Sequence, residues 1–489
     1  MWKWCSLIEG GVVICFIVLL LSYGAGGLKW LRLSPALRKR YTKLPKGSLG
    51  WPLVGETLAL QHCLMSTTPH SFVNERRRRY GNFFLTHLFG SPLLASTDPD
   101  MNRFILNKEE PLFTSSLPKT LSMVVGQNAL LMLTGDRHKR IRRLTTSVFS
   151  PEVLRHHSGR IQQLAISVLK TWKGRKVIVA DEARQYTFNV ALSSIMNVGH
   201  TEKAELFRVK FSALRSGARA LPIDLPGTAF RTALQARKYL AQMIEEEIEE
   251  RKRSKDIRYD DLLEKLIQAP EADGGETLQN EEIIDLVLSS MLAGFDTSAN
   301  TLLFLIYYIG QHPNVLHDLK IEHQEILREK AADDHQPLSY ADYKKMKLTQ
   351  LTINETLRIA NPILSLHRRT LQDVEYNGRI IPANCAVQVW LRSLHTDPTL
   401  YPDPYSFDLD RWQGKPPTSN NFIPFGMGPR RCVGMELARM ELCFFLHCLV
   451  TMYSWELAEE DSPRFFPDPG MRKGSWNRRE RKVRELTRT

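Results

Sequence analysis

A glycine-rich loop near the C-terminal end of the chain contains the cysteine with the clearest chemical context. Cys432 stands in the run Phe425–Gly434, which reads FGMGPRRCVG and fits the pattern FxxGxRxCxG at every fixed position. The glycines let a loop turn tightly and bring backbone amides close to sulfur. Such amides, nearby positive charge and a following helix N-terminus stabilise a thiolate, and a run of helix formers begins at Met435. The loop therefore predicts Cys432 as a thiolate metal ligand; the alternative is a buried structural cysteine.

The neighbours of Cys432 indicate which metal centre the loop would hold. A thiolate donates electron density strongly, which suits an iron in haem that must cleave dioxygen. Arg430, two residues before the cysteine, has a guanidinium group that can pair with a haem propionate. We therefore predict a haem b site with Cys432 as the iron ligand and with Phe425, Gly426 and Arg430 as further cofactor-binding residues.

A long apolar segment in the middle of the chain carries small and polar residues at its centre. Asn280 and the two glutamates after it read as the N-cap and first turn of a helix whose apolar run covers residues 283–309. Gly294 would let a ligand approach the backbone, while Asp296 and Thr297 could relay protons to oxygen. We predict these three as catalytic residues. The alternative is that the glycine and the threonine only pack in a buried helix.

A third pattern predicts a scaffold. Glu355 and Arg358 are three positions apart on one helix face, where such pairs are usually solvated and weak. Here they stand among apolar residues, which favours a partly buried network. Arg411, in the downstream segment 403–412, supplies a third partner. We expect Glu355, Arg358 and Arg411 to be structural residues behind the haem.

Length and composition limit the organisation of the chain. Its 489 residues contain no low-complexity linker or repeat, so we expect one large catalytic domain at residues 53–474. The net charge of +13 comes from scattered basic residues without a nucleic-acid-binding motif, and we expect no nucleic-acid partner. The seven cysteines form no CxxC pair, which argues against a zinc site or a disulfide scaffold and favours a reducing, cytosolic environment.

The ends of the chain differ from this body. Residues 10–28 are uncharged, close to the roughly 20 residues that cross a bilayer. We therefore predict a membrane anchor at residues 1–28 and a basic, proline-containing neck at 29–52; a cleaved signal peptide is the alternative. The excess of positive charge after residue 28 predicts a single-pass protein of the endoplasmic reticulum membrane with a cytosolic catalytic domain. Residues 475–489 read as an atypical basic tail without the expected apolar alternation.

In combination and in this order along the chain, these motifs resemble the cytochrome P450 family. The resemblance implies a mainly α fold, a helical haem domain with small β-sheets. It also implies a monooxygenase that takes electrons from NADPH through a separate flavoprotein, NADPH-cytochrome P450 reductase, and acts on a lipophilic small molecule. The Cys432 loop would lie on one haem face and residues 293–297 on the other, with Glu355, Arg358 and Arg411 as the family's buried triad.

The resemblance adds further cofactor-binding residues and a docking face. His138 and Arg142 match the helix positions where the family often has WxxxR, with histidine in place of tryptophan, and Arg368 matches another propionate-binding arginine. The reductase would dock on a basic face, for which an ordinary solvated helix face is the alternative. This basic face consists of Arg137, Lys139, Arg140, Arg143 and Arg431.

Finer similarity points to the plant branch that oxidises cyclic isoprenoids. Residues 44–57 (LPKGSLGWPLVGET) and 225–230 (LPGTAF) are similar to that branch, and residues 102–106 and 455–459 resemble brassinosteroid hydroxylases. Residues 138–145 and 281–294 look equally like ent-kaurenoic acid oxidases of gibberellin synthesis. We expect steroid hydroxylation in a brassinosteroid-type pathway, with a diterpenoid or triterpenoid oxidase as the alternative. A reductase-independent haem-thiolate isomerase or dehydratase, or a non-catalytic haem protein, is the alternative of another class.

Overall fold

The structure is a computed structural model. It describes residues 44–51, 54–66, 68–174, 176–198, 202–218, 220–254, 259–269, 277–332, 337–413, 418, 420–458, 461–465 and 469–471. Within these ranges the chain is mainly helical and has small β-sheets, as the sequence predicted. The predicted anchor (residues 1–28) and tail (475–489) lie outside the described residues, as does most of the neck. No helix in the described part is long and apolar enough to span a bilayer.

The chain divides into two compact units. The first unit comprises residues 1–114 and 365–394, and the second comprises residues 115–364 and 395–489. The predicted catalytic domain therefore contains both units, and the first is assembled from two stretches that are distant in sequence.

A five-stranded sheet organises the first unit, with strand order β1-β2-β7-β4-β3. Strands β1 and β2 form an antiparallel hairpin whose two-residue turn, Phe89-Gly90, has positive φ at both positions, which matches the right-handed strand twist. β2 then pairs in parallel with β7, and β7 pairs antiparallel with β4. The strands are β1 (Phe83–Leu88), β2 (Ser91–Ser96), β3 (Phe113–Ser115), β4 (Ser365–Thr370) and β7 (Ala386–Trp390).

Short helices and a second hairpin complete this unit. Asp98 caps α5 by accepting from the Met101 amide at 2.7 Å, and Pro99 occupies the first helical turn, where its missing N–H costs nothing. The elements are α3 (Thr57–Met65), α4 (Ser71–Tyr80), α5 (Pro99–Asn107), β5 (Val374–Tyr376), β6 (Arg379–Ile381) and α17 (Leu391–His395). The last residue of α17, His395, already belongs to the second unit.

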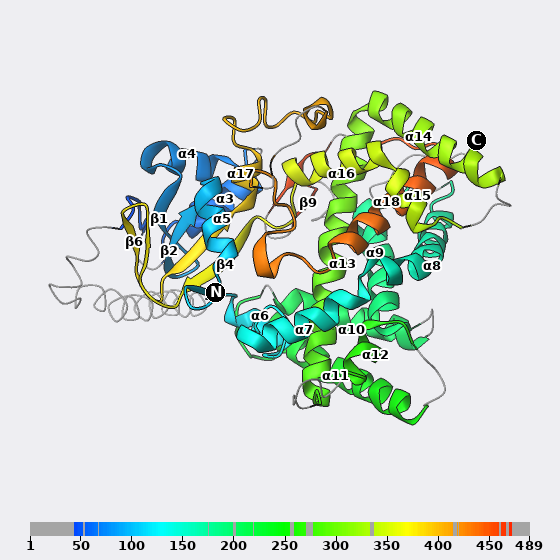
Figure 1. The fold of residues 1–489 in the computed structure, drawn as a ribbon, viewed down its shortest axis with the longest axis horizontal. Coiled ribbons are helices and arrows are strands. Elements are labelled where there is room, and N and C mark those ends of the chain that lie inside the picture. Colours follow the sequence, from blue (N-terminus) through cyan, green and yellow to red (C-terminus); the bar gives the residue numbers. More distant parts are fainter. Residues whose placement is uncertain are drawn as a thin grey trace, which may run out of the picture. The chain divides into compact units, whose positions relative to one another are not determined.

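The second unit is almost entirely helical (Figure 1). Its first helices are α6 (Lys119–Val125), α7 (Gly135–Val148), α8 (Pro151–Lys170), α9 (Val179–Met196), α10 (Glu202–Ala218), α11 (Ala229–Arg253) and α12 (Leu262–Ile267). They are followed by α13 (Asn280–Gln311), α14 (Pro313–Ala332), α15 (Tyr340–Lys345), α16 (Lys347–Ile359) and α18 (Met435–Met452). Two 3₁₀ turns, Asp410–Trp412 and Gly428–Arg430, and the short strands β8 (Pro463–Arg464) and β9 (Gly470–Met471) complete it.

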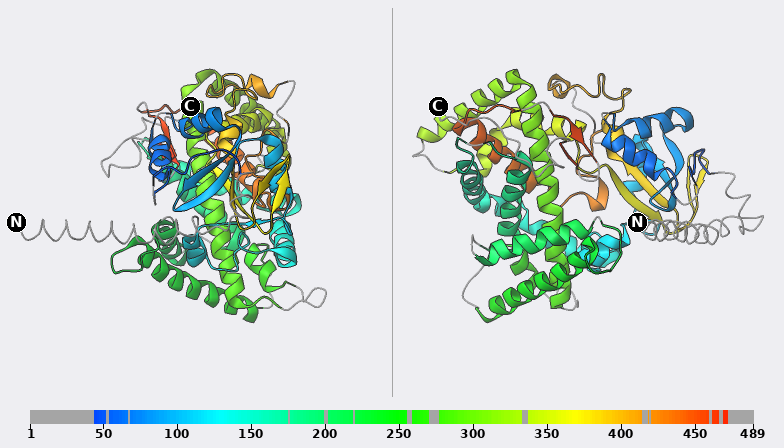
Figure 2. Two further views of the ribbon diagram at one scale, coloured as in Figure 1. Left: turned by 90° about the vertical axis from the view of Figure 1, so that its left-hand side faces the viewer. Right: turned by 180° about the vertical axis from the view of Figure 1, so that it is seen from behind.

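Helix α13, with 32 residues the longest among the described helices, is the axis of this unit (Figure 2). It packs along α9 and also contacts α6, α11, α16 and α18. At its middle the Phe295 ring meets Phe188 of α9 and Phe211 of α10 edge to face, with centroids 6.0 and 5.5 Å apart. This apolar packing fixes the position of the segment on which the sequence placed catalytic residues.

Candidate active site

The glycine-rich loop folds back immediately before α18. Gly426 and Gly428 have φ angles of +72° and +71°, in the left-handed region that favours glycine. The Cys432 amide donates to the Phe425 carbonyl at 2.9 Å and closes the turn. Since α18 begins at Met435, Cys432 lies just before a helix N-terminus, as the sequence predicted.

Residue Cys432 is exposed to solvent in the loop. Desolvation by nearby protein atoms is nevertheless the largest influence on its thiol and raises the pKa. The Gly434 amide and the positive charges of Arg142 and Arg431 lower that pKa. The amide and the cations are the features that stabilise a thiolate, and coordination to a metal ion removes a thiol proton outright.

Two buried polar residues hold the segment that leads into this loop. The Asn361 side chain donates to the Pro424 carbonyl at 3.2 Å, and the His395 ring nitrogen Nε2 accepts from the Ile423 amide at 3.0 Å. Burial and the charge of Arg358 lower the pKa of His395 to about 3, so its ring is neutral and free to accept. Sequence reasoning missed both residues because the contacts join positions 63 and 28 apart, and no local pattern marks them.

Glu355, Arg358 and Arg411 meet in one buried network. Glu355 and Arg358 form a two-pronged ion pair with both contacts at 2.8 Å, and neither side chain is exposed. The Arg411 Nε atom donates to Glu355 at 3.1 Å, and the Trp412 indole donates to its other oxygen at 2.9 Å. Arg358 also donates to the carbonyls of Pro404 and Ser406 in the downstream segment. The three predicted residues are therefore together, and they tie α16 to that segment.

The centre of α13 is accessible, although the helix on either side is buried. Ala293 and Gly294 are exposed and Thr297 is partly exposed, whereas Phe295 is buried. A methyl group built on Gly294 would meet Ala191 at 3.7 Å as its nearest neighbour, so packing does not require a glycine there. The Thr297 hydroxyl donates to the Ala293 carbonyl at 2.8 Å, which leaves its oxygen lone pairs for a donor from outside.

Helix α13 begins one residue earlier than predicted. Gln279 is the N-cap, and its amide donates to the Glu282 carboxylate at 2.8 Å, so Asn280 is the first helical residue and not the cap. A glutamate three residues after the cap is the capping-box arrangement, and glutamine is a weak sequence signal for its first position.

Asp296 is next to the accessible residues Gly294 and Thr297 in the sequence, but its own side chain is buried. Its carboxylate pairs with Arg215 of α10 at 3.1 Å, and the Asp296 side chain is only 6% exposed. The ion pair therefore fixes the carboxylate's direction and joins α10 to α13. Sequence reasoning did not find Arg215, because it lies 81 positions away.

A second acid approaches α13 from α18. Glu441 is buried and makes a hydrogen bond with the Ser298 side chain, next to Thr297. Burial raises the pKa of Glu441 to about 8, so the carboxyl group keeps its proton at neutral pH. The Glu441 backbone carbonyl accepts from the Tyr186 hydroxyl of α9 at 2.9 Å.

The residues predicted to contact haem propionates are distributed over several elements. The Arg430 guanidinium donates to the Leu133 carbonyl at 2.6 Å, and Arg142 of α7 donates to the Arg431 carbonyl at 2.6 Å. His138, one turn before Arg142, is 2% exposed. The structure thus places Arg430, Arg142 and His138 in the second unit with Cys432. Arg368 is on β4 of the first unit, where it is buried and donates to the His367 carbonyl at 3.0 Å.

These residues fit a haem. The described residues contain no group of three or more His, Cys, Asp or Glu that could hold a bare metal ion. A haem iron needs only one ligand from the protein on its proximal side, and the accessible Cys432 thiol has the character for it. Gly294 is exposed, and a methyl group built there would meet only Ala191, so the centre of α13 has room for a ligand beside it. The arginines beside the loop supply positive charge for carboxylate groups.

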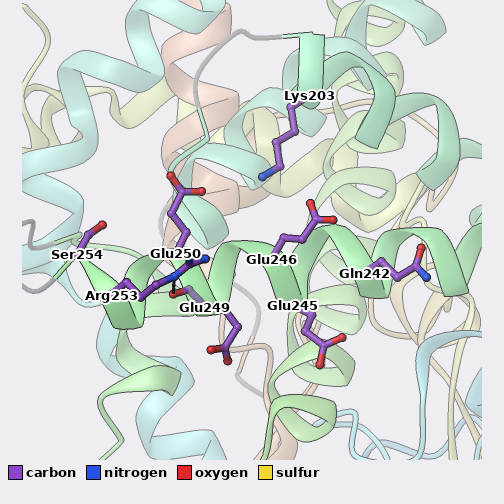
Figure 3. A pocket seen from close by; sticks show the side chains of 8 residues that line it. All are labelled: Lys203, Gln242, Glu245, Glu246, Glu249, Glu250, Arg253 and Ser254. Carbon is purple, nitrogen blue, oxygen red and sulfur yellow. Dashed lines mark hydrogen bonds between the residues drawn. The ribbon is translucent and has the colours of Figure 1, made fainter.

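A surface groove elsewhere in the second unit has a different character. Its volume is about 850 Å³, and its walls are charged side chains of α11 with Lys203 of α10 opposite (Figure 3). Glu246 and Glu250 point to the side of Lys203, and Glu245 and Glu249 point to the other side of α11. The residues that line the groove are all polar or charged, so it is unlike a binding site for a lipophilic substrate.

The comparison with protein families agrees with this geometry. Residues 45–478 match the family model described as cytochrome P450. The chain therefore belongs to the cytochrome P450 family, whose cofactor is haem iron, and it is a cytochrome P450 monooxygenase. Among solved structures, the fold matches retinoic acid bound cyanobacterial CYP120A1 with a TM-score of 0.78 and 27% identity. The match covers 91% of this chain and 99% of that one.

Within the family the chain is similar to named plant proteins. It is 35% identical to a cholesterol 22-hydroxylase of Paris polyphylla, over 89% of this chain and 91% of the relative. It is 37% identical to a 3beta,22alpha-dihydroxysteroid 3-dehydrogenase of Arabidopsis thaliana, over 92% and 95%. It is also 35% identical to abscisic acid 8'-hydroxylase 1 of Oryza sativa subsp. japonica, over 86% of each chain.

Proposed function

We propose that this monooxygenase hydroxylates a steroid in a brassinosteroid-type pathway. The observation that carries the proposal is the similarity, over about nine-tenths of both chains, to relatives named for cholesterol and for a dihydroxysteroid. A rigid, largely apolar steroid binds mainly through buried apolar area, at about 25 cal/mol per Å² before ordering costs.

The proposed chemistry assigns a role to each part of the site. Haem, when bound, supplies the iron that activates dioxygen. Cys432 would hold that iron, with Phe425 and Gly426 shaping the loop around the sulfur. The basic residues proposed to hold the haem propionates are Arg430, Arg142, His138 and Arg368.

We assign the transfer of protons to residues in the centre of α13. Gly294 leaves space beside the backbone, and Thr297, whose proton bonds to Ala293, would accept a hydrogen bond from a donor in that space. Asp296, oriented by Arg215, would pass protons from solvent to this donor. Glu355, Arg358 and Arg411 keep the proximal side rigid and do not touch the reacting atoms.

The proposal includes partners and a location. Electrons would come from NADPH through NADPH-cytochrome P450 reductase, which would dock on the basic face defined above. Of these residues, Arg137 also pairs with Glu282 and Lys139 with Asp136. The segment 1–28 would anchor residues 53–474 to the cytosolic face of the endoplasmic reticulum, with 29–52 as the neck and 475–489 as a tail.

The steroid hydroxylase proposal has two alternatives, one in substrate class and one in reaction class. An oxygenated cyclic isoprenoid acid is a second substrate class, favoured by the similarity to abscisic acid 8'-hydroxylase 1 and compatible with the predicted diterpenoid alternative. A reductase-independent isomerase or dehydratase would not need the acid and hydroxyl pair on α13. Turnover that requires both NADPH and reductase separates the monooxygenase from that class.

The experiment uses microsomes that contain the full chain with a plant reductase. Cholesterol, 22-hydroxylated steroids, ent-kaurenoic acid and abscisic acid are tested for the haem spectral shift and for NADPH-dependent products. We expect a steroid to give both signals at the lowest concentration. A shift with linear fatty acids and none with cyclic isoprenoids would contradict the substrate proposal.

A further inference from the structure

The loop between α6 and α7, residues 126–134, is fastened at its start to α13. The Asn128 amide and the Asn128 side chain both donate to one oxygen of Asp285, at 3.0 Å each. Gly126 has a φ of +98°, and a methyl group built on it would lie 1.9 Å from the Asp285 carboxylate. Only glycine allows the loop to approach α13 so closely, so the contact is a specific fit.

Asp285 is buried and connects the loop to a second helix. Its side chain is 2% exposed, and its other oxygen accepts from Arg237 of α11 at 2.6 Å. The network continues on the loop's other side, because Arg137 of α7 donates to the Asn128 side-chain oxygen at 2.9 Å and pairs with Glu282 of α13. One carboxylate thereby determines the position of the loop relative to α11 and α13.

The end of the same loop is hydrogen-bonded to the glycine-rich loop that carries Cys432. Arg430, two residues before Cys432, donates to the carbonyls of Leu133 at 2.6 Å and Leu131 at 3.5 Å. Asp285 precedes Gly294 by nine residues, which is about 14 Å along a helix axis. The loop therefore runs from the flank of α13 to the loop that carries the proposed iron ligand, and its middle, residues 129–133, is apolar (ALLML).

We propose that Asp285 is a positioning residue that fixes this loop as one wall of the space between Gly294 and Cys432, and so determines which ligands fit there. The inference rests on the proposed function only in placing the reaction between those two residues, and it holds for any lipophilic substrate. Asp285→Asn would turn an amide N–H toward Arg237 or toward the Asn128 donors, so at least one contact is lost and the wall can move.

The test measures ligand size discrimination in the haem-loaded enzyme. Affinities for imidazole, which is small, and for 4-phenylimidazole, which is bulky, are taken from the spectral shift that each produces. The carbon monoxide band of the reduced protein reports thiolate ligation separately. Asp285→Asn and Asn128→Ala should change the ratio of the two affinities about tenfold, the scale of one lost charge-assisted hydrogen bond, and should keep the band.

Asp261→Asn is the matched control. Asp261 is equally buried, pairs with Arg251 at 2.8 Å and caps α12, so its loss lowers stability without a contact to the loop. The control should retain the wild-type affinity ratio. The proposal would be overturned if the affinity ratio changed equally in the control, or if Asn128→Ala kept the wild-type ratio. If Asp285→Asn does not fold, Asn128→Ala decides the test alone. Neither probe is a steroid, so a failed steroid panel leaves this result unaffected.

Discussion

The loop that carries Cys432 and the centre of α13 belong to the same unit, but their polar groups are held differently. Behind the loop, Glu355 and Arg358 are fully buried and every oxygen of Glu355 accepts two or more hydrogen bonds. In the centre of α13, residues Ala293 and Gly294 are exposed, and the Thr297 hydroxyl turns back to its own helix.

The difference follows from what each region has to do. A metal ligand is useful when its sulfur is fixed, and a buried, fully paired network resists movement. A region that receives oxygen and protons needs accessible atoms, and its order comes from the apolar packing of Phe295 and the Asp296–Arg215 pair at its flank. Substitutions should therefore damage folding and haem retention on the first side, and catalysis on the second.

The largest effect is expected in the buried triad. Glu355→Ala leaves the Arg358 and Arg411 charges uncompensated in the interior, which costs about 3–5 kcal/mol. We expect little folded, haem-loaded protein, measured as the carbon monoxide band per total chain. Glu205→Gln, which breaks the exposed Arg208 pair on α10, should cost about 1 kcal/mol or less. Comparable yields from the two variants would show that the triad is not a scaffold.

On α13 the expected loss is catalytic. Thr297→Val and Asp296→Asn should retain the thiolate band but reduce product formation by about 10²–10⁴, the usual contribution of a positioned acid or base. NADPH would be consumed with release of peroxide or water, so the coupling ratio is the measurement. Thr301→Val, one turn along and also bonded back to its helix, is the control and should remain coupled. Normal coupling in both test variants would mean that these residues only pack.

A smaller effect is expected at His395. His395→Phe fills a similar volume but leaves the buried Ile423 amide without its acceptor, a loss of about 1–3 kcal/mol. The thermal midpoint of the thiolate band should fall accordingly. His395→Gln offers a side-chain carbonyl in place of the ring nitrogen and should recover part of the loss. Equal midpoints for the Phe and Gln variants would argue against this hydrogen bond as the cause.

The effect that is smallest per step of the measurement, because it is spread over several pH units, is a pH dependence at Glu441, which faces Ser298 of α13 and Tyr186 of α9. Its pKa is about 8 in the folded protein and 4.5 ordinarily, so between these values the folded state keeps a proton that the unfolded chain releases. The stability contribution of this carboxyl therefore falls as pH rises, by up to about 1.4 kcal/mol per pH unit. Glu441→Gln cannot ionise, and its thermal midpoint relative to wild type should rise from pH 5 to pH 8. A constant difference would contradict the assignment.

What the sequence could predict depended on how local each signal was. The glycines around Cys432 and the start of α18 follow from adjacent residues, and the structure has both. Glu355 and Arg358 were visible as neighbours on one helix face. Arg215 opposite Asp296 and Asn128 opposite Asp285 were not visible, because partners 81 and 157 positions apart depend on how helices pack. The anchor prediction falls on residues that the structure does not describe.

The central claim is that Cys432 is the iron ligand, and the reduced carbon monoxide spectrum tests it most directly. Wild-type protein should absorb near the wavelength characteristic of thiolate ligation, and Cys432→Ala should lose that band. Cys443→Ala, which removes a buried thiol on α18, should retain it. Retention of the thiolate band in Cys432→Ala would contradict the account.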